Sequence, residues 1–201
     1  MVLSIMSFII IDNTKNLANA EMTPLLINYF NNNNFKVSVI SEPTELVINN
    51  VNEIDGIILS GGPILLSQKS ELLSYSKNFT ALIEYPQIPI LGICFGFQLM
   101  GVAYGGIVNG LLQNKKERIW EDINIKNNNE TILFKKFNRK IKVYQCHSDC
   151  LIKCPNDFII TSSSDDNIIE AIECVRKLRF GVQVHPENSE DGLLVLDNFT
   201  D

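Results

Sequence analysis

The stretch PILGICFGFQLMG, residues 89–101, decides how the chain folds. A short apolar run ends at Gly92, and Cys94 and Gly96 follow. A second apolar run then begins, which contains the polar Gln98. The first run has the length and composition of a buried strand, whereas the second is long enough for a helix. A strand that turns sharply into a helix needs small neighbours at the turn, so the pattern predicts a strand–turn–helix unit with Cys94 at its tip.

A cysteine with glycines two residues before and after it matches the G-x-S-x-G nucleophile elbow, with cysteine in place of serine. The N-terminus of the following helix favours the thiolate form of a cysteine in this position. The backbone N–H of Phe95, next to the sulfur, can face an oxyanion. The pattern thus predicts a nucleophilic Cys94; the alternative is a buried structural cysteine in a Gly-rich turn.

Apolar segments alternate between strand and helix character on both sides of this turn. In the first half we expect strands at 7–12, 35–40, 55–60 and 88–93, and helices at 23–30, 70–85 and 96–106. Thr23 is the expected N-cap of the first helix, with Pro24 as its first residue. This alternation predicts an α/β fold in which a mostly parallel sheet is covered by helices on both faces.

The second half of the chain has shorter and more polar strand segments. Strands at 118–125, 130–134 and 140–146 are expected to form a small antiparallel extension, and the Asn tracts at 31–34 and 127–129 to form loops. Further strands are expected at 158–164, 168–174 and 180–185, with a closing helix at 192–199. No repeat or linker interrupts the 201 residues, which predicts a single domain over 1–201.

Composition narrows the functional classes. The chain is 45% hydrophobic and has a formal net charge of −6, which argues against nucleic acid or an anionic membrane as the main partner. No segment has the roughly 20 apolar residues that span a bilayer, and the apolar start lacks the flanks of a signal peptide. Five cysteines without a secretion signal do not indicate a disulfide framework. We expect a soluble, cytoplasmic protein.

Two further motifs complete a candidate active site. FGVQVHPEN places His185 at the end of an apolar strand, with Glu187 two residues later. His185 is the candidate base for the thiol, and Glu187 could fix its tautomer. The motif SGGP, residues 60–63, follows another buried strand, and its glycines let backbone N–H groups approach a ligand. It lacks the lysine of a P-loop, so it does not indicate a nucleotide site.

These three elements resemble the class-I (triad) glutamine amidotransferases. GICFGFQ is similar to the family's G-x-C-x-G-x-Q, SGGP to its oxyanion loop, and HPE to its His and Glu; the resemblance covers almost the whole chain. It implies a flavodoxin-like fold, no cofactor, and glutamine hydrolysis through a thioester on Cys94. His185 would act as base and then acid, Glu187 would orient it, and Gly62 and Phe95 would supply the oxyanion N–H groups.

The resemblance also implies residues that bind the substrate. Gln98 would help to bind glutamine, and the backbone around Ser148 and Asp149, in the segment CHSD, would hold the α-amino and carboxylate groups. His147 then has a positional rather than a catalytic role. A metal site formed by Cys146, His147, Cys150 and Cys154 is the alternative for this segment, but its spacing is not that of a usual zinc site.

The resemblance implies a separate synthetase that accepts the ammonia. SGGP and HSD look like the GMP synthetase branch, whose partner is of the ATP-pyrophosphatase type, whereas Asp12-Asn13 is similar to the anthranilate branch. A glutaminase subunit of an anthranilate or aminodeoxychorismate synthase is therefore an alternative. A standalone γ-glutamyl hydrolase and a catalytically inactive binding module remain as alternatives. The loop after Pro63 and the acidic segment 186–192 are the expected surfaces for a partner.

Overall fold

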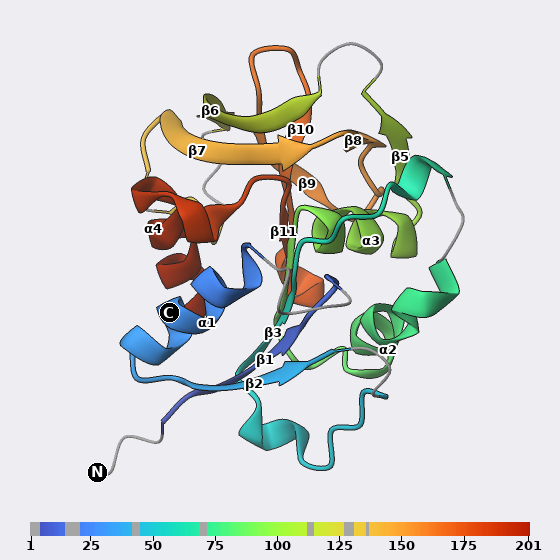
Figure 1. Ribbon diagram of the computed structural model, residues 1–201, viewed down its shortest axis with the longest axis vertical. Helices are drawn as coiled ribbons and strands as arrows, with labels where there is room; N and C mark the ends of the chain where they lie inside the picture. Colours follow the sequence, from blue (N-terminus) through green and yellow to red (C-terminus); the bar gives the residue numbers. More distant parts are fainter. Residues whose placement is uncertain are drawn as a thin grey trace.

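A computed structural model describes residues 5–14, 21–41, 45–68, 72–111, 115–126, 131–135 and 137–201. Within them, nine strands form one sheet in the order β2-β1-β3-β4-β11-β10-β9-β6-β7, and β5 and β8 form a separate pair (Figure 1). The strands are β1 (Ser7–Ile11), β2 (Lys36–Ile40), β3 (Gly56–Leu59), β4 (Ile90–Ile93), β5 (Ile107–Gly110), β6 (Lys116–Ile125), β7 (Lys140–His147), β8 (Asp149–Lys153), β9 (Ile159–Ser163), β10 (Ile169–Cys174) and β11 (Arg179–Val182).

The large sheet is parallel in one half and antiparallel in the other. Strands β2, β1, β3, β4 and β11 are parallel to their neighbours, with β4 between β3 and β11. From β11 onward, β10, β9, β6 and β7 pair antiparallel. The predicted α/β sheet with an antiparallel extension is confirmed, and the extension belongs to the same sheet.

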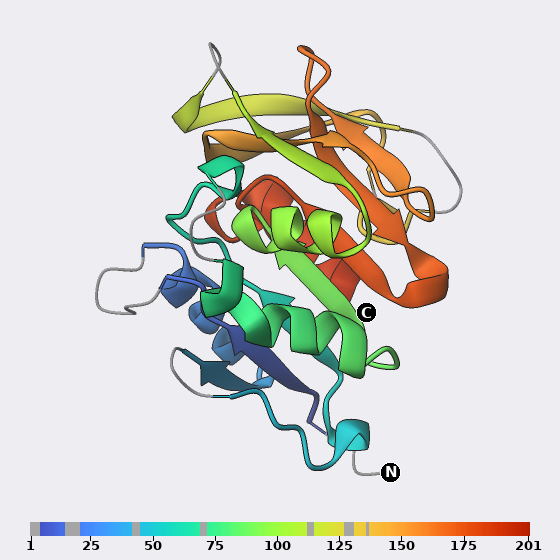
Figure 2. The same cartoon turned by 90° about the vertical axis from the view of Figure 1, so that its right-hand side faces the viewer.

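Helices cover both faces of the parallel half. Figure 1 shows α1 (Thr23–Asn32) and α4 (Glu190–Thr200) on one face, and α2 (Ser76–Glu84) and α3 (Phe95–Ala103) on the other; Figure 2 shows this second face. Short 3-10 turns connect the elements: η2 (Val51–Glu53), η3 (Leu66–Gln68), η4 (Leu72–Tyr75), η5 (Val175–Lys177) and η6 (Pro186–Asn188). No helix in the described part of the chain is long and apolar enough to span a bilayer.

The hydrophobic core lies in two layers separated by the sheet. One layer packs strand residues such as Ile10 and Ile58 against Leu26 of α1 and Leu196 of α4. The other packs Ile57 and its neighbours against α2 and α3. Strands buried on both faces read as continuous apolar runs, because alternate side chains enter opposite layers. This explains why the central strands could be located from the sequence.

The structure corrects four local predictions. Thr23 is the first residue of α1 rather than its N-cap, because its hydroxyl donates to Asp12 Oδ1 at 2.9 Å. Strand β2 is only partly buried because it lies at the sheet edge. The segment 131–134 forms a turn rather than a strand. The helix expected from residue 70 is α-helical only from Ser76.

One pair of strands was not predicted, and two segments with a predicted role lie outside the described residues. The pair of strands β5 and β8 was not predicted, because both strands are short and follow a helix and a polar segment. The loop expected at 127–129 and residues 69–71 of the loop after Pro63 lie outside the described residues.

Glu170 is a fully buried acid at the junction of the two sheet halves. Its backbone carbonyl accepts a hydrogen bond from the N–H of Gln183, one residue beyond β11. Burial raises the pKa of Glu170 to about 8. Glu170 is therefore neutral in the fold at pH 7, whereas in the unfolded chain its carboxyl group is ionised.

This burial makes stability depend on pH. A carboxyl group with a raised pKa in the folded state binds its proton more tightly there, so stability falls as pH rises from the unfolded to the folded pKa. Between pH 4.5 and 8 we expect the wild type to lose on the order of 3 kcal/mol of unfolding free energy relative to Glu170→Gln. Urea unfolding at several pH values measures this, with Glu84→Gln as the exposed control. If the difference in unfolding free energy between the wild type and Glu170→Gln stays constant across this pH range, the prediction is contradicted.

Candidate active site

Cys94 lies at the junction of β4 and α3 with φ of 50° and ψ of −105°. Residues with side chains rarely adopt a positive φ, so this backbone is strained. A Cβ on Gly92 would lie 2.7 Å from the carbonyl oxygen of Gly96, and a Cβ on Gly96 would clash with the carbonyl oxygen of Leu59. The turn thus excludes side chains at both glycines, and the predicted strand–turn–helix unit is confirmed.

His185 and Glu187 form a buried pair beside this turn. Nδ1 of His185 lies 2.8 Å from Oε1 of Glu187. Burial alone would lower the pKa of His185, but the charge of Glu187 and the contact with Cys94 raise it well above its usual value. With Nδ1 held by the carboxylate, Nε2 is the nitrogen left for proton exchange.

A cavity of about 230 Å³ opens directly beside the sulfur. The sequence places its walls far apart, in the loop after β3, in α3 and at the end of β7. They meet because parallel strands end at one edge of the sheet and β7 passes over that edge. The cavity is lined by six predicted site residues: Gly62, Cys94, Phe95, Gln98, Ser148 and Asp149.

Hydrogen bonds fix the wall formed by Ser148 and Asp149. Nε2 of Gln98 donates to the backbone carbonyl oxygen of Asp149 at 2.8 Å and to Oε1 of Gln183 at 3.1 Å. The carboxylate of Asp149 accepts from the N–H and the hydroxyl of Ser67, both at 2.7 Å. The amide nitrogen of Gln98 and the carboxylate of Asp149 therefore hold the cavity wall together.

His147 is buried and lines the first cavity together with Cys94. Its Nδ1 donates to the carbonyl oxygen of Asp149 at 3.0 Å, and its Nε2 lies 3.1 Å from the side-chain amide of Gln145. Burial lowers the pKa of His147 to about 4, so the imidazole is neutral. These contacts hold the backbone of the cavity wall.

The cysteines near His147 do not gather around a common point. No group of three metal-binding side chains within the described ranges is placed to hold an ion. Sγ of Cys154 contacts the carbonyl oxygen of Phe158, and burial raises the pKa of both Cys150 and Cys154 to about 11. Such thiols behave as structural residues.

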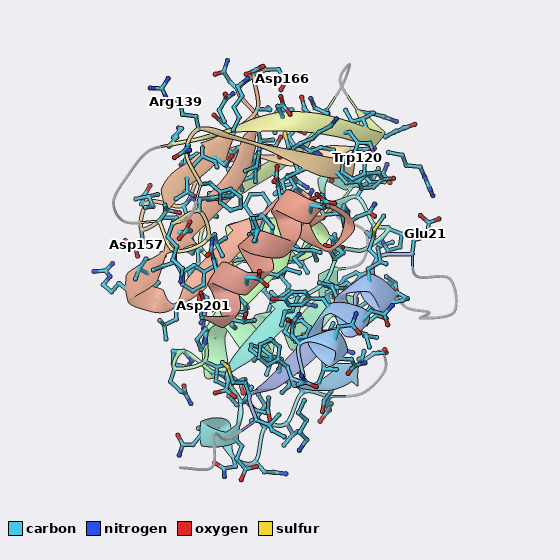
Figure 3. The ribbon with its side chains drawn as sticks, turned by 90° about the vertical axis from the view of Figure 1, so that its left-hand side faces the viewer. Glu21, Trp120, Arg139, Asp157, Asp166 and Asp201 are labelled. Carbon is cyan, nitrogen blue, oxygen red and sulfur yellow. The ribbon has the colours of Figure 1, made fainter. Side chains whose placement is uncertain are left out.

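A second cavity, of about 300 Å³, lies on the other side of Cys94 and is lined by His185 and Glu187. Glu21 lies at its wall and forms an ion pair with Arg118 of β6 at 2.8 Å. Figure 3 shows Glu21 and Trp120 on the same face of the molecule. The sulfur is thus accessible from two sides.

Glu117 of β6 was not predicted as a site residue. It is exposed and lines the first cavity. Cys146 of β7 lines both cavities. Register explains Glu117: Lys116 pairs with His147 and Ile119 with Gln145 in the antiparallel ladder of β6 and β7, so Glu117 lies opposite Cys146, where the register shifts. No local sequence signal reports such a pairing.

Comparisons with known proteins agree with this geometry. The family model "Glutamine amidotransferase class-I" matches residues 10–199. One of the subunits of the glutamine-hydrolysing GMP synthase of Methanobrevibacter smithii is 32% identical, over 89% of this chain and 94% of that relative. The GMP synthase of Lactobacillus johnsonii is 37% identical over 78% of this chain but only 30% of its own length.

Comparison with solved structures supports the fold. A crystal structure of a glutamine amidotransferase from Thermotoga maritima superposes with a TM-score of 0.74 at 21% identity, covering 90% of this chain and 76% of that one. At that identity the likeness concerns the fold alone, whereas the family model spans almost all of the chain. The chain belongs to the class-I glutamine amidotransferase family.

Proposed function

We propose that the chain hydrolyses glutamine at Cys94 and passes the ammonia to a separate synthetase subunit in a GMP synthase-type reaction. The observation that carries this proposal is the strained thiol beside a buried His185–Glu187 pair, at the wall of a cavity with room for a small amino acid. Because all five cysteines are free, we place the protein in the cytoplasm, where thiols stay reduced.

The first step forms a tetrahedral intermediate on Cys94. Nε2 of His185 takes the thiol proton, and the sulfur of Cys94 attacks the γ-carboxamide carbon of glutamine. The negative oxygen that develops on that carbon is held by the backbone N–H groups of Gly62 and Phe95. Glu187 stabilises the imidazolium, consistent with the raised pKa of His185.

The second step releases the products. His185 returns its proton to the nitrogen, the carbon–nitrogen bond breaks, and ammonia leaves a γ-glutamyl thioester on Cys94. Water then attacks the thioester with His185 as base, which gives glutamate and restores the thiol. The second cavity lies on the side of His185, so we assign it to the departing ammonia.

Substitutions at the histidines and at Glu187 should differ in how strongly they affect turnover and KM. His185→Ala removes the proton carrier and should lower turnover on the order of 10² to 10⁴-fold. Glu187→Gln should lower turnover less, because it only weakens the orientation and charge of the imidazole. His147→Ala should mainly raise KM, since it loosens the cavity wall. Steady-state release of ammonia measures all three, and a turnover that depends on His147 but not on His185 would refute the assignment.

To bind glutamine, the site must offer hydrogen-bond partners to the α-ammonium and α-carboxylate groups of the substrate. The backbone of Ser148 and Asp149 lines the first cavity and suits the α-carboxylate. The carboxylate of Asp149 is already bonded to Ser67, so we assign the α-ammonium group to Glu117, the exposed carboxylate of the cavity. A charge-assisted hydrogen bond of this kind fixes which end of the substrate enters.

This assignment is tested by removing either the carboxylate of Glu117 or the amino group of the substrate. Glu117→Gln should raise KM for glutamine roughly ten-fold or more, the effect of one charge-assisted bond. The same variant should show no such change with glutaric acid monoamide, which lacks the amino group. Glu121→Gln is the matched control, because the carboxylate of Glu121 pairs with Lys116 at 2.7 Å. An equal effect of Glu117→Gln on both substrates would contradict the assignment.

The relatives indicate what accepts the ammonia. The Methanobrevibacter relative is named as one subunit of a GMP synthase, and the Lactobacillus GMP synthase is much longer than the region that this chain matches. Both facts support a separate synthetase partner, and we propose that it is an ATP-pyrophosphatase subunit that aminates xanthosine monophosphate.

A half-exposed tryptophan offers a docking point for this partner. Trp120 is 53% exposed, and its ring contacts Tyr144 edge-on at 5.6 Å between centroids. Tyr144 in turn contacts His185 at 6.4 Å, so the surface and the catalytic base are joined by two ring contacts. Exposed tryptophans are frequent hot spots of protein interfaces.

The acidic segment 186–192 contributes less surface than expected. Pro186, Glu187 and Ser189 are buried, and Asp191 accepts a hydrogen bond from the backbone N–H of Lys142 at 2.8 Å. Of its acidic residues, Glu190 alone is exposed. A groove of about 540 Å³ lies here between Glu190 and Trp120, so we place the partner contact at this groove.

Adding the partner should stimulate the glutaminase. We expect Trp120→Ala to reduce this stimulation about ten-fold, relative to its own basal rate, because a hot-spot contact is lost. The assay follows glutamate release in the presence of ATP and xanthosine monophosphate, with and without the ATP-pyrophosphatase subunit of a GMP synthetase.

Leu73→Ala is the control, because Leu73 is 92% exposed and lies in η4. Stimulation of Trp120→Ala equal to that of the wild type would reject the docking point. No stimulation of the wild type, together with fast hydrolysis of γ-glutamyl compounds, would reject the synthetase partner and favour a standalone hydrolase.

A further inference from the structure

Cys146 lies against the candidate nucleophile and has no role in the hydrolysis described above. Sγ of Cys94 lies 3.8 Å from the backbone carbonyl oxygen of Cys146. Both residues line both of the cavities beside the turn. Cys146 is partly exposed, so small molecules that enter the cavities can reach it.

The side chain of Cys146 projects on the catalytic side of β7. Residues two apart in a strand share a face, so Cys146 projects on the same side as Tyr144. The ring of Tyr144 contacts His185, which places this face of β7 toward the catalytic base. The two thiols therefore border the same space.

The geometry points to Cys146 as a resolving thiol that forms a reversible disulfide with Cys94 after oxidation by a peroxide. Hydrogen peroxide oxidises the Cys94 thiolate to a sulfenic acid and is itself reduced to hydroxide. The sulfur of Cys146 then attacks the Cys94 sulfur, its thiol proton leaves with the hydroxyl group as water, and the disulfide bond forms.

The fold brings the pair near disulfide geometry. A disulfide needs Cβ atoms about 3.5–4.5 Å apart. The Cys94 sulfur lies 3.8 Å from the carbonyl oxygen of Cys146, so the two residues are direct neighbours, and the disulfide requires the Cys146 side chain to turn toward that sulfur.

The other cysteines are less suited than Cys146 to act as the resolving thiol. Cys150 and Cys174 are buried, and Cys154 contacts the carbonyl oxygen of Phe158. Burial raises the pKa of Cys150 and Cys154 to about 11, which suppresses their thiolate form. Oxidation should therefore be selective for the Cys94–Cys146 pair.

The consequence for activity rests on the proposed function of Cys94. A disulfide occupies the attacking sulfur and halts glutamine hydrolysis, and it prevents further oxidation to the irreversible sulfinic acid. Reduction by a dithiol then restores the enzyme. The glutaminase would thus stop under peroxide stress and recover afterwards.

The test treats the whole chain with hydrogen peroxide, followed or not by dithiothreitol. We expect tryptic mass spectrometry of the wild type to find a peptide linked through Cys94 and Cys146, two hydrogen atoms lighter than the separate peptides. Glutaminase activity should fall on the order of ten-fold and return with dithiothreitol. Cys150→Ser is the matched control and should behave as the wild type does.

Cys146→Ser and Cys146→Ala, each compared with its own reduced activity, should lose activity that dithiothreitol does not restore, with sulfinic acid on Cys94. Absence of the linked peptide in the wild type, or full recovery of both Cys146 variants, would overturn the proposal. A linked peptide without loss of activity would keep the disulfide but reject Cys94 as the nucleophile, so the two claims fail separately.

Discussion

The strained turn at Cys94 is the constraint on which the rest of the site depends. Gly92 and Gly96 allow α3 to fold back so closely that it packs on the backbone of β3 at Leu59. Because β4 lies between β3 and β11, the loops after all three strands meet at one edge of the sheet. The oxyanion loop, the thiol and the imidazole are neighbours for this reason.

The antiparallel half of the sheet forms one wall of the site. Strand β7 returns to the parallel half, where the N–H of His185 donates to the carbonyl oxygen of Tyr144 at 2.9 Å. This places the segment from Tyr144 to Asp149 over the turn and forms the wall of the first cavity. The parallel half thus holds the thiol, the imidazole and its carboxylate, and the antiparallel half contributes Glu117 and residues 146–149 to the wall of the first cavity.

Much of this arrangement could be predicted because its signals are local. Gly92, Cys94 and Gly96 lie within five residues, and His185 and Glu187 are two apart. What could not be predicted depends on pairing between distant strands: Glu117 enters the site through the register of β6 with β7. The N-cap at Thr23 was wrong for a similar reason, since a tertiary contact with Asp12 claims its hydroxyl.

The covalent intermediate tests the central claim most directly. The chain should be mixed with glutamine, quenched in acid within the first turnover, digested and examined by mass spectrometry. A γ-glutamyl group on the peptide that contains Cys94, and on no other cysteine peptide, is the result that the proposed mechanism predicts. Glutamate release by the wild type without any adduct on Cys94, or undiminished release by Cys94→Ala, would contradict it.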